Sequence, residues 1–282
     1  MPVYEQSYRH WPGELNPKAQ TWFIIMRDGI KMLWRRWMII LLFFASIPFM
    51  VRVAQIYIVT RLAEDPQFAG FAKQFQVDPG LFESFLNQQS YFLILIVILA
   101  GAGLISKDKK YNALQLYLSR PLSQWDYLLG KFAIVGFYAG LATFIPAFLL
   151  LFIKILLSDN LDFITQYYWL PLSILGYSFL IILVYGGLIL ALSSSGKGAR
   201  FAGISFFAII GLSNLMKAIL SSIPSAGAIS IGSDLKQVGN FLFKQPASSS
   251  FSIWLASGVL VGVIVISLLV LKKQIRGTEV VK

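Results

Sequence analysis

The chain has 282 residues, of which 57% are hydrophobic, and its mean hydropathy is +0.69. Soluble domains contain about 45–50% apolar residues, so this composition indicates a membrane protein. Only 13% of the residues are charged, yet the net charge is +11, and the basic residues lie at the ends of apolar runs. That placement disfavours a nucleic-acid-binding surface. The absence of cysteine excludes disulfides, Cys-ligated zinc, iron–sulfur clusters and thiol nucleophiles.

The first 36 residues are polar and mixed in charge, so no signal-peptide hydrophobic core is expected, and the first apolar run should be retained as a membrane anchor. Residues 18–36 repeat apolar side chains on one helical face and charged side chains on the other. We predict a helix that lies in the membrane interface, either as a general anchor or as part of a partner contact. Its candidate functional residues are Trp22, Arg27, Lys31, Trp34 and Arg35.

Six apolar stretches follow, and each is long enough to cross about 30 Å of hydrocarbon, which needs about 20 helical residues. Pro48, Pro146 and Pro171 are expected to kink their helices. Small-residue patterns such as Gly258 with Gly262 predict close helix contacts, within one chain or between two copies. We predict an all-α polytopic membrane protein in which residues 37–272 form a six-helix transmembrane domain, with spans at about 37–59, 88–106, 131–154, 167–193, 199–220 and 250–272.

Six spans place both termini on one side of the membrane, so the loop charges can be compared between the two sides. The side with the termini carries 17 Lys and Arg, and the other side carries 7, while acidic residues divide 6 and 7. Cytoplasmic loops of multi-pass proteins carry the excess of Lys and Arg. We therefore predict that residues 1–36, the segment at 107–131 and the tail at 273–282 are cytoplasmic.

Two segments on the opposite side contain more apolar residues than free loops do. In the outer loop at 61–87, phenylalanines share one helical face, and Asp78-Pro79-Gly80 has the residues of a helix start, which predicts two short helices. The segment at about 218–243 is rich in Ser and Gly and is interrupted at Pro224. It is too apolar for a free loop and too interrupted for a span, so we predict a re-entrant pair of short helices.

The sequence contains no pattern for nucleotide or metal chemistry. Gly130-Lys131 and Gly196-Lys197 do not belong to phosphate-binding loops, because positions 125 and 191 are not glycine and neither lysine precedes Ser or Thr. The single histidine, His10, has no partners for a metal site or a catalytic triad. No Asp or Glu lies in the core of a predicted span, which disfavours a proton- or sodium-driven carrier. We predict a non-catalytic protein that binds no cofactor, metal or nucleic acid.

The most informative segment lies between the second and third predicted spans. Residues 107–121 have the pattern of a short basic amphipathic helix that stops at Ser119-Arg120-Pro121, and the chain re-enters the membrane at Gly130-Lys131. A helix resting on anionic lipid explains the basic charge equally well, but it does not explain the Arg-Pro stop. A soluble partner that binds this segment from the cytoplasm explains both.

Residues 105–132 resemble the ABC-type export permeases that pair with a separate ATPase subunit. In that family the second span ends in an acidic residue, followed by a Gly-Thr-Leu helix, a Leu-Ser-Arg-Pro turn and a Leu-Gly-Lys start of the third span. This chain has Asp108, Leu114, Leu118-Ser119-Arg120-Pro121 and Leu129-Gly130-Lys131 at those places, with Asn112-Ala113 where the family has Gly-Thr. The six-span layout, the N-terminal helix and the broken segment before the last span are similar as well.

The resemblance implies a dimer of two permease subunits, alike or different, in the plasma (inner) membrane, with two ATPase subunits on the cytoplasmic face. ATP and Mg²⁺ would bind the ATPase subunits, and their cycle would move a coupling helix at about 107–121 and export a substrate. The implied ATPase contacts are Asp108, Lys109, Lys110, Tyr111, Leu114, Gln115, Leu118, Arg120 and Pro121. The alternative from another class is a membrane scaffold that anchors a cytoplasmic complex without transport.

Overall fold

A computed structural model describes residues 21–64, 77–113, 123–157, 162–220, 222–247 and 251–276. Over these residues the regular elements are all helical, and six helical segments are long and apolar enough to cross a membrane. The predictions of an all-α fold and of six helices long and apolar enough to span a membrane are confirmed. The six segments are Arg36–Arg61, Pro79–Lys110, Gln124–Leu157, Leu170–Ser194, Ala199–Ile219 and Ile253–Ile275.

Several of these segments consist of more than one helix. In chain order, the first half of the molecule comprises α1 (Thr21–Leu33), α2 (Arg36–Ala45), α3 (Ile47–Glu64), α5 (Pro79–Gly101), α6 (Ser106–Lys110), α8 (Gln124–Ala142) and α9 (Phe144–Leu157). The second half comprises α10 (Asp162–Gln166), α11 (Leu170–Ser194), α12 (Ala199–Ile219), the 3-10 helix η1 (Pro224–Ile229), α13 (Ile231–Leu242) and α14 (Ile253–Arg276).

Proline explains the breaks inside the first and third spans. Helix α2 gives way to α3 at Ser46, shortly before Pro48, and α8 gives way to α9 at Thr143, shortly before Pro146. A proline has no N–H, and its ring clashes with the carbonyl group four residues earlier, so the helix is interrupted there. The predicted kink at Pro171 is wrong, because this residue lies in the first turn of α11, where its missing N–H is not needed.

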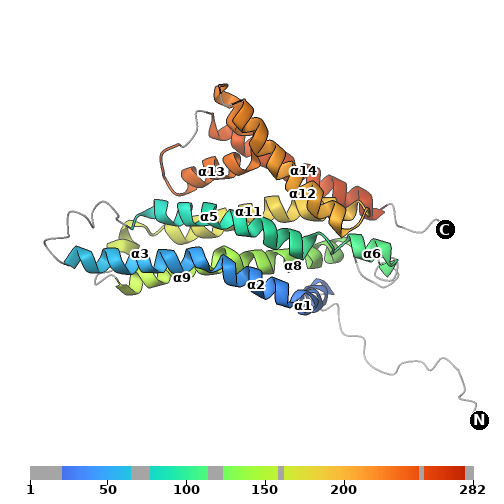
Figure 1. Ribbon diagram of the computed structural model, residues 1–282, viewed down its shortest axis with the longest axis horizontal. Coiled ribbons are helices and arrows are strands. Elements are labelled where there is room, and N and C mark those ends of the chain that lie inside the picture. The colour runs from blue at the N-terminus through green and yellow to red at the C-terminus, as the bar shows by residue number, and fades with distance from the viewer. Residues whose placement is uncertain are drawn as a thin grey trace, which may run out of the picture.

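Helix α11 is the central helix of the bundle. It is the most deeply buried of the six spanning segments in the described chain, and it contacts α5, α8, α9, α12 and α14. Helices α12 and α14 incline away from the layer of α5, α8 and α11, and α13 lies in the opening (Figure 1). Helices α1 and α6 and the end of α14 lie at one end of the bundle, and the end of α3 lies at the other (Figure 1).

The segment predicted as two short outer helices has a different organisation. Asp78 is the N-cap of α5, because its side chain accepts a hydrogen bond from the N–H of Leu81 at 3.2 Å. Helix α5 then runs without interruption into the second span, so the separate second helix expected here is wrong. Its polar residues Glu83 and Gln89 are buried and have hydrogen-bond partners: Asn87 donates to the Glu83 carboxylate, and Gln89 donates to the carbonyl oxygen of Ala45 at 2.7 Å. Residues 65–76 of this segment lie outside the described residues.

The segment predicted as re-entrant contains two short helical elements. Helix η1 begins at Pro224, and α13 begins after Ser230, whose side chain accepts a hydrogen bond from the N–H of Ser233 at 3.3 Å. Helix α13 contacts α5, α11, α12 and α14, so it is held by four spans rather than extending into solvent. The depth of this segment in the membrane stays a prediction.

Helix α1 packs closely across α8 at a glycine. A Cβ atom on Gly130 would lie 2.8 Å from Cβ of Ile25 and 2.9 Å from the carbonyl oxygen of Trp22, so only glycine allows this approach. Further along α8, the hydroxyl of Tyr138 donates to the carbonyl oxygen of Ile30 at 2.7 Å. These contacts attach α1 to the bundle. That α1 lies in the membrane interface stays a prediction.

The small-residue pattern of the last span makes no close contact in this chain. No described atom lies within 4 Å of a Cβ atom placed on Gly258 or Gly262. The expectation that these glycines bring helices together within one chain is therefore wrong. A contact between two copies at this face of α14 stays a prediction.

Replacing Gly130 with alanine should displace α1 from α8. The added methyl group meets the base of the β-branched Ile25 side chain and the backbone carbonyl oxygen of Trp22, which cannot move without α1, so we expect a loss of about 1–3 kcal/mol in the free energy of unfolding. Gly140→Ala on the same helix is the matched control, because its methyl group meets no described atom within 4 Å. Thermal unfolding in detergent measures both variants. Equal melting temperatures would contradict the close-packing role of Gly130.

Candidate functional site

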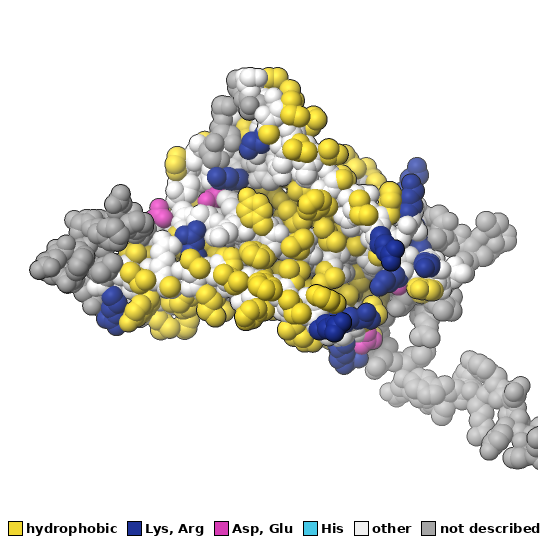
Figure 2. Space-filling view, in the orientation of Figure 1, with side chains coloured by type: hydrophobic (Ala, Val, Ile, Leu, Met, Phe, Trp, Pro, Cys, Tyr) yellow, Lys and Arg dark blue, Asp and Glu magenta, His cyan; other side chains and the backbone are white. Residues whose placement is uncertain are grey.

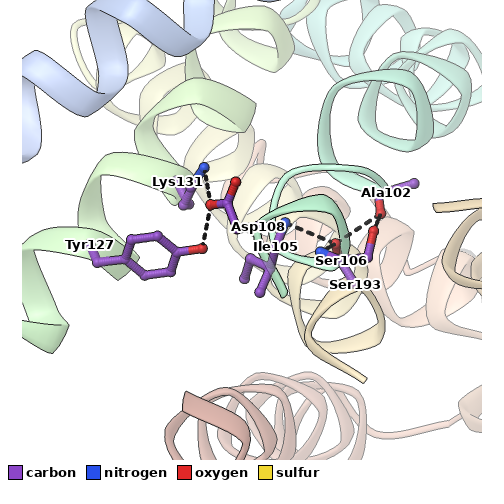
Figure 3. A network of polar contacts seen from close by, with 7 residues as sticks. All are labelled: Ala102, Ile105, Ser106, Asp108, Tyr127, Lys131 and Ser193. Carbon is purple, nitrogen blue, oxygen red and sulfur yellow. Dashed lines mark hydrogen bonds and ion pairs between the residues drawn. The ribbon is translucent and has the colours of Figure 1, made fainter. Parts of the chain in front are cut away.

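The junction between α5 and α6 is held together by a serine from α11. Helix α5 ends at Gly101, and α6 begins at Ser106 after one turn. The buried hydroxyl of Ser193 donates to the carbonyl oxygen of Ala102 at 2.8 Å and accepts from the N–H groups of Ile105 and Ser106 at 3.2 and 3.1 Å (Figure 3). One side chain therefore bonds three backbone groups at the place where the helix is interrupted.

An acidic residue of α6 pairs with the start of α8. The Nζ atom of Lys131 lies 2.7 Å from Oδ2 of Asp108, and the hydroxyl of Tyr127 donates to the same oxygen at 2.7 Å (Figure 3). Tyr127 and Lys131 are four residues apart and share one face of α8. Tyr127 is fully buried, and the Lys131 side chain is 7% exposed. The two ends of the segment at 107–131 are thus joined by a charge-assisted pair.

Helix α6 also contacts the last span. The Nζ atom of Lys109 donates to the carbonyl oxygen of Gln274 at 2.9 Å and to its Oε1 atom at 3.1 Å. Gln274 lies in the last turn of α14, where carbonyl groups have no helical N–H partner and a cation is favourable. Ser193, Asp108 and Lys109 therefore link α6 to α11, α8 and α14. We call α6 with these contacts the α6 junction.

The other side of α6 carries a basic groove. Lys107 and Lys110 of α6 and Lys197 and Arg200 beside the start of α12 line a cavity of about 450 Å³, which we call the basic groove. Tyr111, which is 71% exposed, also lines it. Lys and Arg side chains gather at this end of the molecule, on the right in Figure 2. No acidic side chain is among the described residues of the groove, so its charge suits an acidic partner surface.

The structure divides the predicted coupling residues into groups. Asp108 and Lys109 bond inward, whereas Lys110 and Tyr111 are exposed. One continuous helix over about 107–121 is wrong, because α6 ends at Lys110 and Asn112 has a φ of +53°, a left-handed conformation that Asn tolerates. Five further predicted contacts lie outside the described residues: Leu114, Gln115, Leu118, Arg120 and Pro121.

Helix α1 and the α6 junction attach to adjacent residues of α8. Gly130 contacts α1, and Lys131 pairs with α6. Of the residues predicted for the interfacial helix, the one half-buried is Trp22, whose carbonyl oxygen lies close to Gly130. The other four are exposed: Arg27, Lys31, Trp34 and Arg35.

Several features of this site are not evident from the sequence pattern. Ser193 belongs to a serine run that indicates a helix end, and α11 does end there, but nothing local shows that its hydroxyl reaches α5. The start of α8 has a signal in Ser123 and Asp126, which form a capping box. That signal places the helix start at Gln124, seven residues before the predicted start of the third span. Because α8 starts at Gln124, Tyr127 lies in its first turn, where its side chain is buried.

The Asp108–Lys131 pair can be tested by charge exchange. Lys131→Asp alone leaves two carboxylates at the junction and should lower the free energy of unfolding by about 3–5 kcal/mol, as when one partner of a buried pair is lost. The exchanged protein, Asp108→Lys with Lys131→Asp, restores opposite charges and should recover part of that loss. Melting temperatures of the single variants and the double variant give the coupling energy. Purely additive losses would show that the pair contributes nothing.

Within the described ranges, no group of three or more His, Cys, Asp or Glu side chains is placed to hold a metal ion. No protein-family model matches the sequence, and no curated protein is significantly similar to it. A function for this membrane protein therefore has to come from its own residues and geometry.

Proposed function

We propose that this chain is the permease subunit of an ATP-driven ABC exporter whose ATPase is a separate subunit. The observation that carries the proposal is the α6 junction, in which a short helix between the second and third spans is bonded to the third, fourth and sixth spans. The sequence pattern that resembles export permeases begins at Asp108 and ends at Lys131, and these two residues form the ion pair. A pattern with that pairing is suited to transmit movement between a partner and the bundle.

The contacts of α6 provide three routes by which a movement of this helix reaches the spans. Asp108 connects α6 to α8, Lys109 connects it to α14, and Ser193 connects it to α11. Breaking a buried ion pair costs about 3–5 kcal/mol, so a partner that displaces α6 would shift the connected spans rather than separate them from α6. Because α11 is the central helix, its displacement reaches α5 and α12 as well.

The basic groove and Tyr111 are the proposed docking surface for the ATPase subunit. Tyrosine is enriched among the residues that contribute most to binding at interfaces, and Tyr111 is exposed beside the groove. The cations around it would steer an acidic partner surface and increase the association rate. In this proposal ATP and Mg²⁺ bind in the ATPase subunit, and this chain contributes no nucleotide site and no catalytic residue.

A second permease subunit, alike or different, completes the transporter in this proposal. The glycines at 258 and 262 support a close contact between copies, since they leave the face of α14 without side-chain bulk. Both termini and α6 would face the cytoplasm from the plasma (inner) membrane. The excess of Lys and Arg at the α6 end supports this orientation (Figure 2).

A membrane scaffold that does not transport needs a docking surface for its partner. It does not need contacts that connect this surface to the membrane-spanning helices. The bonds of Asp108 and Lys109 to α8 and α14 have no part in anchoring a partner. They favour the exporter over the scaffold.

The proposed orientation can be tested with single cysteines, since the chain contains none. Ser222→Cys and Lys244→Cys, both exposed at the end away from α6, should react in intact cells with a maleimide that does not cross membranes. Asn112→Cys and Gly198→Cys at the α6 end should react only after the cells are permeabilised. Reaction of Asn112→Cys in intact cells would reverse the orientation and exclude a cytoplasmic ATPase at α6.

The docking surface can be tested by co-purification of the tagged chain from its native membrane. We expect a P-loop ATPase to be retained, Tyr111→Ala to weaken its binding by roughly thirtyfold, and Lys110→Glu to slow association most at low salt. Lys244→Glu is the matched control, because it changes an exposed lysine at the opposite end. Full retention of the ATPase by the variant that combines Tyr111→Ala with Lys110→Glu would place its contact elsewhere.

The same complex distinguishes a transporter from a scaffold. Spin labels on Tyr91→Cys of α5 and Ser222→Cys, both exposed, report distances at the end away from α6. In an exporter, trapping the ATPase with ATP and vanadate should change this distance, and Asp108→Asn should reduce the change while binding persists. An unchanged distance in the unsubstituted complex would favour the scaffold.

A further inference from the structure

A second polar site lies far from the α6 junction, where α12 inclines away from α5 and α13 occupies part of the opening (Figure 1). It is a cavity of about 310 Å³ between α5, α11, α12 and α13, and we call it the lysine cavity. Lys217 of α12 and Lys236 of α13 line it, together with the amides of Asn87 and Asn214. Because most helices of this chain are apolar, a cavity lined by these polar groups is a candidate binding site. The charge of its lining determines which ligands it can bind.

The two lysines differ from the other described basic residues at this end of the bundle. Lys217 donates to the hydroxyl of Ser233 at 2.6 Å, and neither Lys217 nor Lys236 forms an ion pair with a described carboxylate. The other basic residues bond polar side chains or lie over aromatic rings outside the cavity: Arg52, Arg61, Lys154 and Lys244. The charge of Lys217 and Lys236 is therefore available to a ligand.

Two acidic residues lie near the cavity and offset its charge only in part. Glu83 is buried, accepts a hydrogen bond from Asn87 and interacts electrostatically with Lys236. Asp234 is fully buried near Lys217, and its carboxylate oxygens accept no hydrogen bond from the described chain. Burial raises the pKa of Asp234 to about 7, which disfavours the charged form of this carboxyl group. Both lysines line the cavity, whereas neither of the two acidic residues does, so a ligand in the cavity meets the positive groups.

Hydrogen bonds within the wall leave N–H donors for a ligand. The hydroxyl of Ser230 donates to Oδ1 of Asn214 at 2.6 Å, which leaves the amide N–H groups of Asn214 without an acceptor among the described residues. Lys217 uses one of its three N–H groups on Ser233. Two ammonium groups and an amide donor around one space match an anion with several acceptor oxygens, of which phosphate is the commonest in membranes.

Part of the wall is apolar, and exposed apolar residues lie beside the cavity. Ile94, Ile210 and Leu235 line the cavity, and Leu215 and Ile219 of α12 are exposed close to Lys217 in the sequence. We infer that the lysine cavity binds a phosphate-class anion between Lys217 and Lys236, either free or as the headgroup of a lipid-like amphiphile. This inference goes beyond transport and does not depend on the ATPase subunit.

Binding can be measured on the purified full-length chain in a non-ionic detergent. The probes are inorganic phosphate, dioctanoyl phosphatidylglycerol and dioctanoyl phosphatidylcholine, and the readout is the melting temperature as a function of probe concentration. We expect a saturable rise with phosphatidylglycerol. The combined variant Lys217→Gln with Lys236→Gln should bind at least about tenfold more weakly, and Lys217→Arg with Lys236→Arg should retain binding. Lys244→Gln, at the same end but outside the cavity, should behave as the unsubstituted protein.

The probes also separate the two sources of the anion. A rise with phosphatidylglycerol and with inorganic phosphate, both lost in the glutamine variant, supports a site for the free anion. A rise with phosphatidylglycerol alone supports a headgroup site that needs the acyl chains. An equal rise with phosphatidylcholine, a rise that persists in the glutamine variant, or no rise with any probe would overturn the inference. Because no ATPase is present, these outcomes do not bear on the exporter proposal.

Discussion

The ion pair between Asp108 and Lys131 is the contact on which the α6 end of the molecule depends. Removing two charges from water costs several kcal/mol for each ion, so such a pair persists only where other contacts compensate. Here Tyr127 donates a hydrogen bond to the same carboxylate oxygen. The Asp108 side chain is 17% exposed, and this remaining contact with solvent lowers the cost of desolvation. With Asp108 bonded to α8, Lys109 reaches α14 and Lys110 is exposed to solvent. The orientation of the short helix therefore follows from one side-chain pair.

Adjacent residues of α8 hold α1, which precedes the first span, and α6, which follows α5. Gly130 allows the backbone of α1 to approach α8, because any side chain there would meet Ile25 and Trp22. Lys131, the next residue, faces α6 instead. A displacement of α8 would thus move α1 and α6 together. This arrangement gives Gly130 and Lys131 a structural role that does not involve a phosphate-binding loop.

The basic residues at the two ends of the bundle lie in different surroundings. At the α6 end, the basic residues of the basic groove lie at the surface, where water and a partner can reach them (Figure 2). At the other end, the inclination of α12 and α14 opens a space that α13 fills only in part, and Lys217 and Lys236 line what remains. The lysines in both places form no ion pair with a described carboxylate. The basic groove suits the surface of an acidic protein, whereas the two lysines that share one cavity suit a small anion.

The sequence by itself determined the six apolar spans, because partition into the membrane depends on composition and length. It also determined the breaks near Pro48 and Pro146, because the proline ring acts on its own helix turn. It did not show that α5 extends back to Asp78, since burial of polar side chains depends on neighbouring helices. Asp108 and Lys131 both belong to the recognised pattern, but their pairing required the packing of α6 against α8. Only the tertiary structure could decide such contacts, because they join residues that are separated in the sequence.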